Sequence, residues 1–293
     1  MKKIIYLLMS LSLVAFASCS DDDKDSPSST DNTQTENGGS GDNSGNNGSG
    51  DSSGSNSGVT YPVFKSGTEN GHDYVDLGLT SGTRWATANV GASKPQDYGN
   101  YYAWGETTTK EVYNWETYKY GSDYNQLTKY CNSSSCGKDG FTDTKTTLDL
   151  SDDAAAANWG GKWRMPTREQ QDELRNECYW VWTGTYNNSH VYGYIVYKAK
   201  TSSDKGKKIY SSGYSSGTPS ASYSLSDAHI FLPDAGYRGN GGLSYAGSRG
   251  YYRSSSLDTD HPSSAWYVYF YSGNVSSYDD GRCWGYSVRA VFK

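Results

Sequence analysis

The apolar residues of this chain fall into two regions separated by a long polar segment. The first region is the run from Ile4 to Phe16, and the second is everything after residue 58. Between them, residues 20–58 contain no aromatic or aliphatic side chain and consist mainly of Ser, Gly, Asn, Asp and Thr. Such a segment cannot bury a core, so we expect it to be disordered. Residues 59–293 are numerous enough for one domain with a well-buried core.

Within residues 59–293, runs of Tyr, Trp and Val alternate with Gly and Pro at intervals of about ten residues, which predicts short strands joined by long loops. Two segments instead predict helices. Ser151–Trp159 has two aspartates in its first turn and four alanines behind them. Thr167 opens the second helix, because Thr167 and Gln170 have the spacing of a capping box. The predicted fold class is α+β, mostly β, with two or so helices.

Strict alternation of side chains is clearest in residues 265–271, which predict a strand. The face that we expect to point into the core carries Trp266, Val268 and Phe270. The opposite face carries Tyr267, Tyr269 and Tyr271. A row of tyrosines offers amphipathic contact area that loses little side-chain entropy on binding. The alternative is that these tyrosines simply suit a strand and pack beneath a loop.

The N-terminus has the layout of an export signal, with Lys2 and Lys3 before the apolar run. The run is too short for a comfortable membrane-spanning helix. Residues 16–19, Phe-Ala-Ser-Cys, resemble a bacterial lipobox, so we expect residues 1–18 to be removed and Cys19 to be lipidated; the alternative is an ordinary signal with a chance cysteine. The acidic residues 21–23 are similar to export tags of Bacteroidota surface lipoproteins. We therefore expect an outer-membrane lipoprotein exposed on the cell surface, with residues 19–58 as its lipidated end and a stalk that spans about 35 Å.

Charge excludes some classes of partner. Residues 59–293 hold 23 basic and 24 acidic residues, so the domain is nearly neutral. There is no basic field for nucleic acid or anionic lipid. With Cys19 lipidated, four cysteines remain in an oxidising compartment, and they allow three disulfide connectivities. We favour Cys131 with Cys136 and Cys178 with Cys283; a metal site is the alternative, but no ligand spacing supports it.

Six short motifs resemble the FISUMP-type (Fibrobacter succinogenes major paralogous) domains of Bacteroidota surface proteins. They are residues 74–79 (YVDLGL), 83–87 (TRWAT), 102–106 (YAWGE), 159–167 (WGGKWRMPT), 231–238 (FLPDAGYR) and 285–289 (GYSVR). The match covers nearly all of residues 59–293. It implies a C-type-lectin-like fold, in the branch that also contains formylglycine-generating-type proteins, whereas the biochemical role of the family is largely undefined. Arg253 departs from the family pattern, which usually has Trp at this position.

In that superfold the C-terminal strands and loops usually present the ligand surface. Some bacterial and phage members have this region rewritten by diversity-generating retroelements, which act on Asn-type codons and rarely yield Lys, Glu or Gln. Residues 239–284 contain ten Ser, seven Tyr and seven Gly, and no Lys, Glu or Gln. Diversification is one hypothesis for this composition, and a Tyr/Ser/Gly-rich surface selected for other reasons would look similar.

We therefore place the candidate ligand-binding residues in this segment and at its edges. Most of them lie among turn residues, so we expect loops to present them. They are Arg238, Asn240, Tyr245, Arg249, Tyr251, Arg253, Asp258, Asp260, His261, Tyr267, Tyr269, Tyr271, Tyr278, Asp279, Asp280, Arg282 and Trp284.

The sequence carries no constellation typical of an enzyme. Residues 213–217 match the nucleophile-elbow pattern but do not lie between a predicted strand and helix. The four histidines are scattered without metal-ligand or triad spacing, and calcium motifs of sugar-binding lectins are absent, although Asp279 and Asp280 could ligate a hard cation. We expect a non-enzymatic protein, without cofactor or metal, that binds an extracellular protein or glycan. The alternative is a structural subunit or adhesin component of a cell-surface assembly.

Overall fold

Residues 62–213 and 215–293 are described by a computed structural model. The predicted signal peptide, Cys19 and the stalk through residue 58 lie outside these described residues. Strands dominate the described residues and only two α-helices occur among them, which confirms the predicted α+β, mostly β class. In the described part of the chain, neither helix is long and apolar enough to cross a bilayer.

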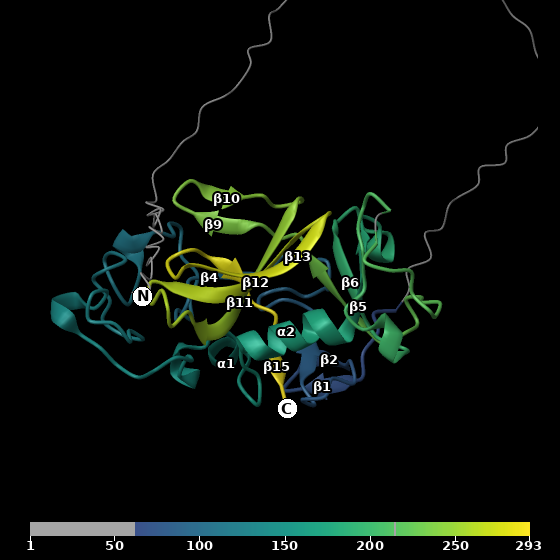
Figure 1. The fold of residues 1–293 in the computed structure, drawn as a ribbon, viewed down its shortest axis with the longest axis horizontal. Coiled ribbons are helices and arrows are strands. Elements are labelled where there is room, and N and C mark those ends of the chain that lie inside the picture. Colours follow the sequence, from purple (N-terminus) through teal and green to yellow (C-terminus); the bar gives the residue numbers. More distant parts are fainter. Residues whose placement is uncertain (1–61, 214) are drawn as a thin grey trace, which may run out of the picture. The chain divides into compact units, whose positions relative to one another are not determined.

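A five-stranded sheet, in the order β13-β12-β11-β14-β4, contains most of the C-terminal segment (Figure 1). Its three long strands form an antiparallel meander, and the short β14 runs parallel to β11 and antiparallel to β4. Successive side chains along a strand point to opposite sides of such a sheet, and residues that face each other on neighbouring strands point to the same side. The strands are β4 (Tyr101–Tyr102), β11 (Arg249–Leu257), β12 (Ser264–Tyr271), β13 (Asn274–Gly281) and β14 (Tyr286–Ser287).

Two four-stranded sheets and one hairpin complete the β structure. The order β7-β5-β6-β8 joins β5 (Cys178–Thr183), β6 (Gly193–Lys198), β7 (Lys208–Ile209) and β8 (His229–Pro233). The order β1-β2-β3-β15 joins β1 (Gly67–Glu69), β2 (His72–Asp76), β3 (Arg84–Ala86) and β15 (Val291–Phe292). The hairpin pairs β9 (Tyr237–Gly239) with β10 (Gly242–Ser244).

The two α-helices are α1 (Ala154–Trp159) and α2 (Arg168–Glu177). The capping box predicted for α2 is present: Thr167 accepts from the Gln170 backbone, and the Gln170 side chain accepts from the Thr167 backbone. The first helix begins later than predicted, because Asp153 is its N-cap and accepts from two backbone N–H groups. Residues before it form a 3-10 turn, and the 3-10 helices are Trp115–Thr117, Lys138–Gly140, Leu150–Asp152, Tyr186–Asn188 and Ser202–Asp204.

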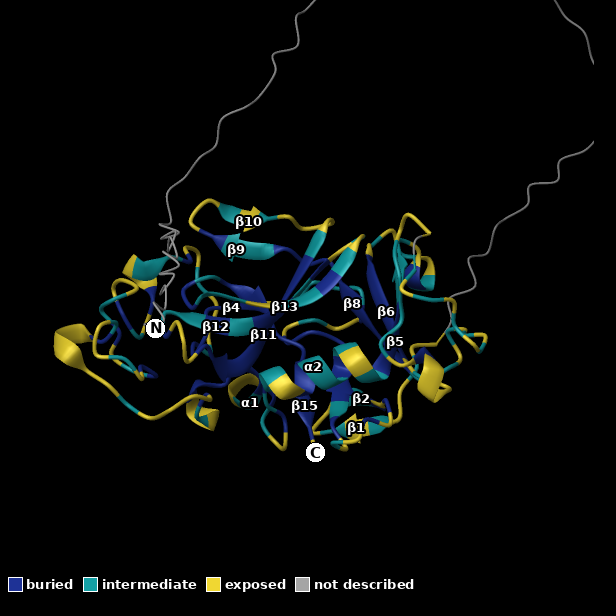
Figure 2. Cartoon of the chain, in the orientation of Figure 1, coloured by how far each residue is buried: buried dark blue, intermediate teal, exposed yellow. Residues whose placement is uncertain are grey.

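The core lies between the sheets and α2, where buried residues converge (Figure 2). Gln171 of α2 donates to the carbonyl of Tyr252 in β11 at 2.8 Å, so the helix is tied to the five-stranded sheet. Arg289 is buried in the core and donates to Asn89 and to backbone carbonyls that include that of Phe231. Burial lowers the pKa of Arg289 to about 10. Arg289 belongs to the motif at residues 285–289, and in this structure it links parts of the chain that are far apart in the sequence.

Trp266 differs from the prediction that it faces the core. Val268 and Phe270 are buried as expected, but Trp266 is only half-buried. The guanidinium of Arg168, the first residue of α2, lies over its ring at 3.3 Å from the centroid. The ring of Trp266 is therefore covered by a charged side chain at the helix start and is not enclosed by apolar side chains.

The predicted disulfides are also wrong. The structure describes Cys131, Cys136, Cys178 and Cys283, and none of them forms a disulfide. Cys178 packs at the junction of α2 and β5, whereas Cys283 packs in a different cluster beside Tyr101 and Tyr113. The thiol of Cys131 donates to the carbonyl of Ser133 at 3.0 Å.

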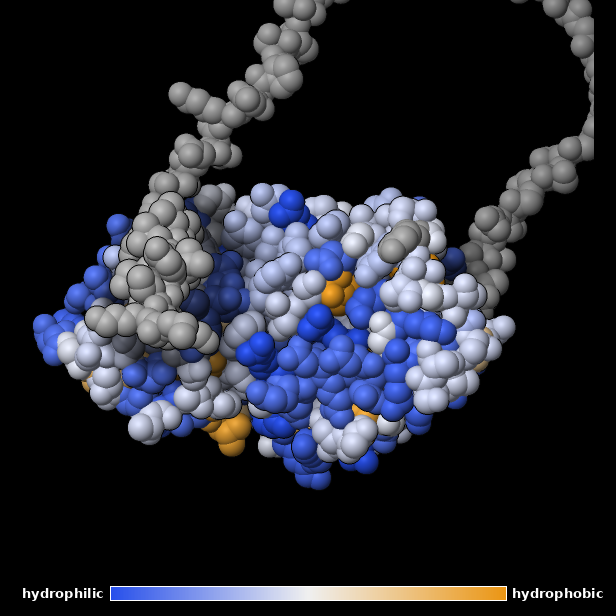
Figure 3. Space-filling view, in the orientation of Figure 1, coloured by the Kyte–Doolittle hydropathy of each residue, from blue (hydrophilic) through white to orange (hydrophobic). Residues whose placement is uncertain are grey.

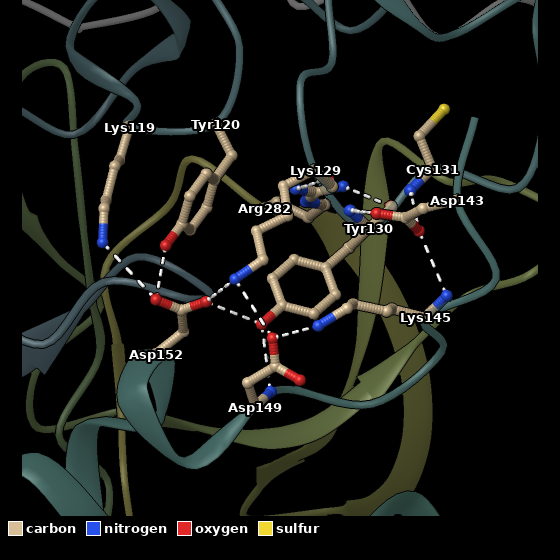
Figure 4. A network of polar contacts seen from close by, with 10 residues as sticks. All are labelled: Lys119, Tyr120, Lys129, Tyr130, Cys131, Asp143, Lys145, Asp149, Asp152 and Arg282. Atoms are coloured by element: carbon tan, nitrogen blue, oxygen red, sulfur yellow. Dashed lines mark hydrogen bonds and ion pairs between the residues drawn. The ribbon is translucent and has the colours of Figure 1, made fainter. Parts of the chain in front are cut away.

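A polar network centred on Asp152 ties the loop before α1 to the end of β13 (Figure 4). The carboxylate accepts from the hydroxyls of Tyr120 (2.5 Å) and Tyr130 (2.7 Å) and pairs with Lys129. Burial would raise the pKa of this carboxyl, but the three donors lower it to about 2. Arg282, which follows β13, donates to the carbonyls of Lys129 and Tyr130 in the same network. The C-terminal strand end is therefore held by contacts that the sequence spacing does not reveal.

Candidate ligand-binding site

A hollow of about 400 Å³ opens where the five-stranded sheet meets the β9–β10 hairpin. We call it the tyrosine hollow, because six of the eight residues that line it are tyrosines. A hollow of this volume is within the usual size range of ligand sites. The lining residues are Tyr237, Tyr245, Arg249, Tyr251, Tyr267, Tyr269, Tyr278 and Asp280.

Strand register explains why these tyrosines meet. Tyr251 on β11 is opposite Tyr269 on β12, and Tyr267 on β12 is opposite Tyr278 on β13. Facing residues on neighbouring strands share one side of the sheet, so their rings gather there. The hairpin adds Tyr237, whose ring centroid is 5.1 Å from that of Tyr251.

The hollow has a buried floor and an exposed rim. Tyr251 and Tyr267 are only 6% and 7% exposed, while Tyr245 and Tyr278 at the rim are 48% and 46% exposed. Such half-exposed rings present both an apolar face and a hydroxyl to solvent. In Figure 3 the surface over β9 and β10 is pale, and the outer face of α2 is strongly hydrophilic. The hairpin side is thus the less polar of these two surfaces.

Tyr245 is held at the rim by its own turn. Its φ of +56° lies in the left-handed region, which is uncommon for a bulky residue. The backbone N–H groups of Ser248 and Arg249 both donate to the Tyr245 carbonyl, at 3.1 and 3.0 Å. The Arg249 guanidinium in turn lies 4.0 Å from the centroid of the Tyr245 ring. The turn therefore fixes an aromatic ring and a cation side by side at the opening.

Asp280 lies at the other end of the hollow and is already engaged. One carboxylate oxygen accepts from the hydroxyl of Tyr286 at 2.5 Å, and the other accepts from the backbone of Gly281 at 2.6 Å. Burial raises the pKa of Tyr251 to about 12, and it also raises the pKa of Tyr267. These tyrosines are neutral at physiological pH and retain their hydroxyl protons.

The structure brings together seven of the predicted candidates in this hollow, but on strands more than on loops. Arg249 and Tyr251 lie on β11, and Tyr278, Asp279 and Asp280 lie on β13, so the prediction that loops present them is wrong. The segments rich in Tyr and Ser that we expected to form loops are instead parts of the long strands β11 and β13.

Other candidates lie outside the hollow for identifiable reasons. Arg253 and Arg282 are fully buried, so neither contacts a ligand directly, which corrects their assignment as binding residues. Asn240 accepts from Asn114 at 3.0 Å, and the ring of Trp284 packs beside Gly239 and Gly281. Two more candidates do not line the hollow: Arg238, whose guanidinium lies 5.7 Å from the Tyr101 ring centroid, and Tyr271, which is 40% exposed.

Sequence reasoning missed Tyr237. It precedes the compositionally unusual segment by two positions, and its own motif was assigned to the fold rather than to the site. The bridge between Gly236 and Gly250, beside the start of β9 and in β11, brings it next to Tyr251, and no local sequence pattern predicts that contact.

Asp258, His261 and Asp279 converge at the β11–β12 turn. One ligand atom from each lies within 4.8 Å of the others, and two carboxylates with an imidazole are donors that a divalent cation accepts. Asp279 points away from the hollow, because it alternates with Asp280 along β13. Burial and the neighbouring Asp258 raise the pKa of Asp279, while the hydrogen bond to Asp258 raises the pKa of His261. Asp260 adds its backbone N–H to the Asp258 carboxylate at 3.1 Å.

A second hollow, of about 430 Å³, lies at the start of α2 and is lined by charged, amide and hydroxyl residues. Three of its charged and amide groups have partners within the lining: Glu173 accepts from Ser81, and Gln170 accepts from Arg164 at 2.7 Å. These contacts fix the helix to the β2–β3 loop, and they suit a structural joint better than a ligand site.

Comparison with models of known protein families, with curated proteins and with solved structures finds no match for this chain.

Proposed function

We propose that this protein is a surface-anchored, non-enzymatic recognition protein that binds a ligand outside the cell in the tyrosine hollow. The observation that carries the proposal is the convergence of six tyrosines from three strands, a hairpin and a turn on one hollow. Folding alone does not require half-exposed aromatic rings such as Tyr245 and Tyr278 at its rim.

The geometry suits recognition for physical reasons. Tyrosine has only two side-chain torsions, so it provides large contact area at low entropic cost on binding. Here Tyr267 of the floor is already packed edge to face on the buried Tyr286, with ring centroids 4.9 Å apart. A preorganised aromatic surface loses little additional freedom when a ligand binds.

The proposal includes the anchor and the fold family suggested by the sequence. Lipidated Cys19 would hold the chain at the outer membrane, and residues 20–58 would extend the domain outward. The lectin-like superfold of the FISUMP-type resemblance agrees with a mostly β structure whose C-terminal strands carry the hollow.

Retroelement diversification remains part of the proposal. Every residue that lines the hollow except Tyr237 comes from residues 239–284, the segment without Lys, Glu or Gln. A template repeat and a reverse-transcriptase gene beside this gene would support diversification, and the absence of both would argue against it.

The test is to probe glycan and protein arrays with the full chain and with a variant carrying Tyr269→Ala and Tyr278→Ala. These rings line the hollow but are less buried than Tyr251 and Tyr267, so their loss should leave the fold intact. Tyr124→Ala with Tyr192→Ala is the matched control, because both tyrosines are exposed and neither lines the hollow.

We expect ligand hits that the hollow variant loses and the control variant keeps. Hits that persist unchanged in the hollow variant would contradict the proposed site. A chain that forms defined oligomers without any added ligand, through the same tyrosines, would instead support the role of an assembly subunit.

A further inference from the structure

We propose that the tyrosine hollow binds an acidic segment of a partner protein, with a ligand carboxylate paired to Arg249. The inference rests on the proposed function and names the chemistry of its ligand. It follows from which charged groups at the hollow already have partners and which do not.

The acidic end of the hollow is internally satisfied. Both carboxylate oxygens of Asp280 accept short hydrogen bonds from within the protein, from Tyr286 and Gly281. A ligand cation or hydroxyl would have to compete with donors that are already fixed in place. Asp280 is therefore a structural acceptor that orients Tyr286 beneath the floor.

The basic end is different. Arg249 makes no ion pair with any carboxylate among the described residues. Its guanidinium stacks on Tyr245 at the opening and makes a hydrogen bond with the Tyr251 side chain. A guanidinium has five N–H donors, so further donors are left for a ligand. A carboxylate is the ligand group that such a fork binds most strongly, by two parallel hydrogen bonds.

A second arginine adds positive charge beneath the floor. Arg253 is fully buried and donates to the backbone carbonyls of Ala265, Asp280 and Gly281. Its guanidinium carbon lies 3.9 Å from the Tyr286 ring centroid. Neutral carbonyls accept its hydrogen bonds, so its charge is not cancelled by a paired carboxylate.

These two arginines also argue against a cationic ligand. Aromatic rings attract cations through their electron-rich faces. Here Arg249 occupies the Tyr245 face and Arg253 the Tyr286 face, so the protein supplies its own cations. An incoming lysine or quaternary ammonium would meet like charge from Arg249 at the opening and from Arg253 beneath the floor.

A peptide fits the lining better than an acidic sugar. Sugar hydroxyls need acceptors as well as donors. The one carboxylate of the lining, Asp280, is already engaged, so only the weaker, neutral tyrosine hydroxyls are left to accept. A peptide brings a carboxylate for Arg249 together with apolar side chains for ring faces such as those of Tyr269 and Tyr278. Tyr and Arg are also the residues that dominate protein interfaces.

The experiment measures binding of the full chain to three immobilised probes at 50 and 500 mM NaCl. The probes are a random Glu/Tyr copolymer, a random Lys/Tyr copolymer and polygalacturonate, a carboxylated polysaccharide. The test variant is Arg249→Gln, which keeps size and removes charge. The control is Arg84→Gln, since Arg84 is a partly exposed arginine on β3 that does not line the hollow.

We expect the Glu/Tyr copolymer to bind best and to bind more weakly at high salt. Arg249→Gln should weaken that binding by roughly tenfold or more and flatten its salt dependence, while Arg84→Gln should change neither. Stronger binding of either other probe, or equal binding of the Glu/Tyr copolymer by Arg249→Gln, would overturn the inference. If no probe binds while array hits still require Tyr269 and Tyr278, the acidic-peptide inference fails and the proposed function stands.

Discussion

Arg253 shows how one residue can change role between sequence and structure. Its sequence position, where the FISUMP-type pattern usually has tryptophan, suggested a change at the surface, yet this guanidinium is fully buried and bound to three carbonyls. Replacing it with methionine would leave those carbonyls without donors. We expect Arg253→Met to lower the free energy of unfolding by roughly 3 kcal/mol in urea titrations. Arg249→Met is the control, and a loss below about 1 kcal/mol is expected for that rim position; equal losses would contradict the account.

Asp234 should make the stability of the protein depend on pH. It is fully buried, and neither of its carboxylate oxygens has a hydrogen-bond partner among the described residues. Burial raises the pKa of Asp234 to about 7. The native state therefore keeps this proton where the unfolded chain, with its ordinary pKa near 3.8, loses it, so stability falls as pH rises from about 4 to 7.

The Asp234→Asn variant should remove this dependence. Relative to the unsubstituted protein, we expect the variant to gain roughly 3 kcal/mol in free energy of unfolding between pH 5 and pH 8. Urea titrations at the two pH values measure this difference. A constant difference between the two proteins at both pH values would show that Asp234 is not held neutral by its environment.

At the scale of elements, α2 depends on a cap that the sequence predicts. Thr167 and Gln170 satisfy backbone donors at the helix start. Thr167→Ala should lower the free energy of unfolding by about 1 kcal/mol, measured by thermal or urea unfolding. Thr109→Ala, at an exposed position, is the control and should be nearly neutral. A neutral Thr167→Ala would mean that packing alone fixes this helix end.

Elements governed by local chemistry were predictable, and those governed by distant contacts were not. The capping box located α2, and alternation placed Val268 and Phe270 in the core. Trp266 failed because what covers it is Arg168, about a hundred positions earlier in the chain. The segment that holds most of the hollow was visible from composition, whereas Tyr237 required knowledge of the long-range Gly236–Gly250 bridge that brings it to Tyr251.

At the scale of the whole molecule, the central claim is that a ligand contacts the tyrosine hollow and no other exposed tyrosines. The most direct measurement is tyrosine nitration of the full chain with and without a ligand from the arrays, read by mass spectrometry. We predict protection of Tyr245, Tyr269 and Tyr278, with no change at the exposed Tyr124 and Tyr192. Ligand-dependent protection at Tyr124 or Tyr192, with the hollow tyrosines still modified, would contradict the account.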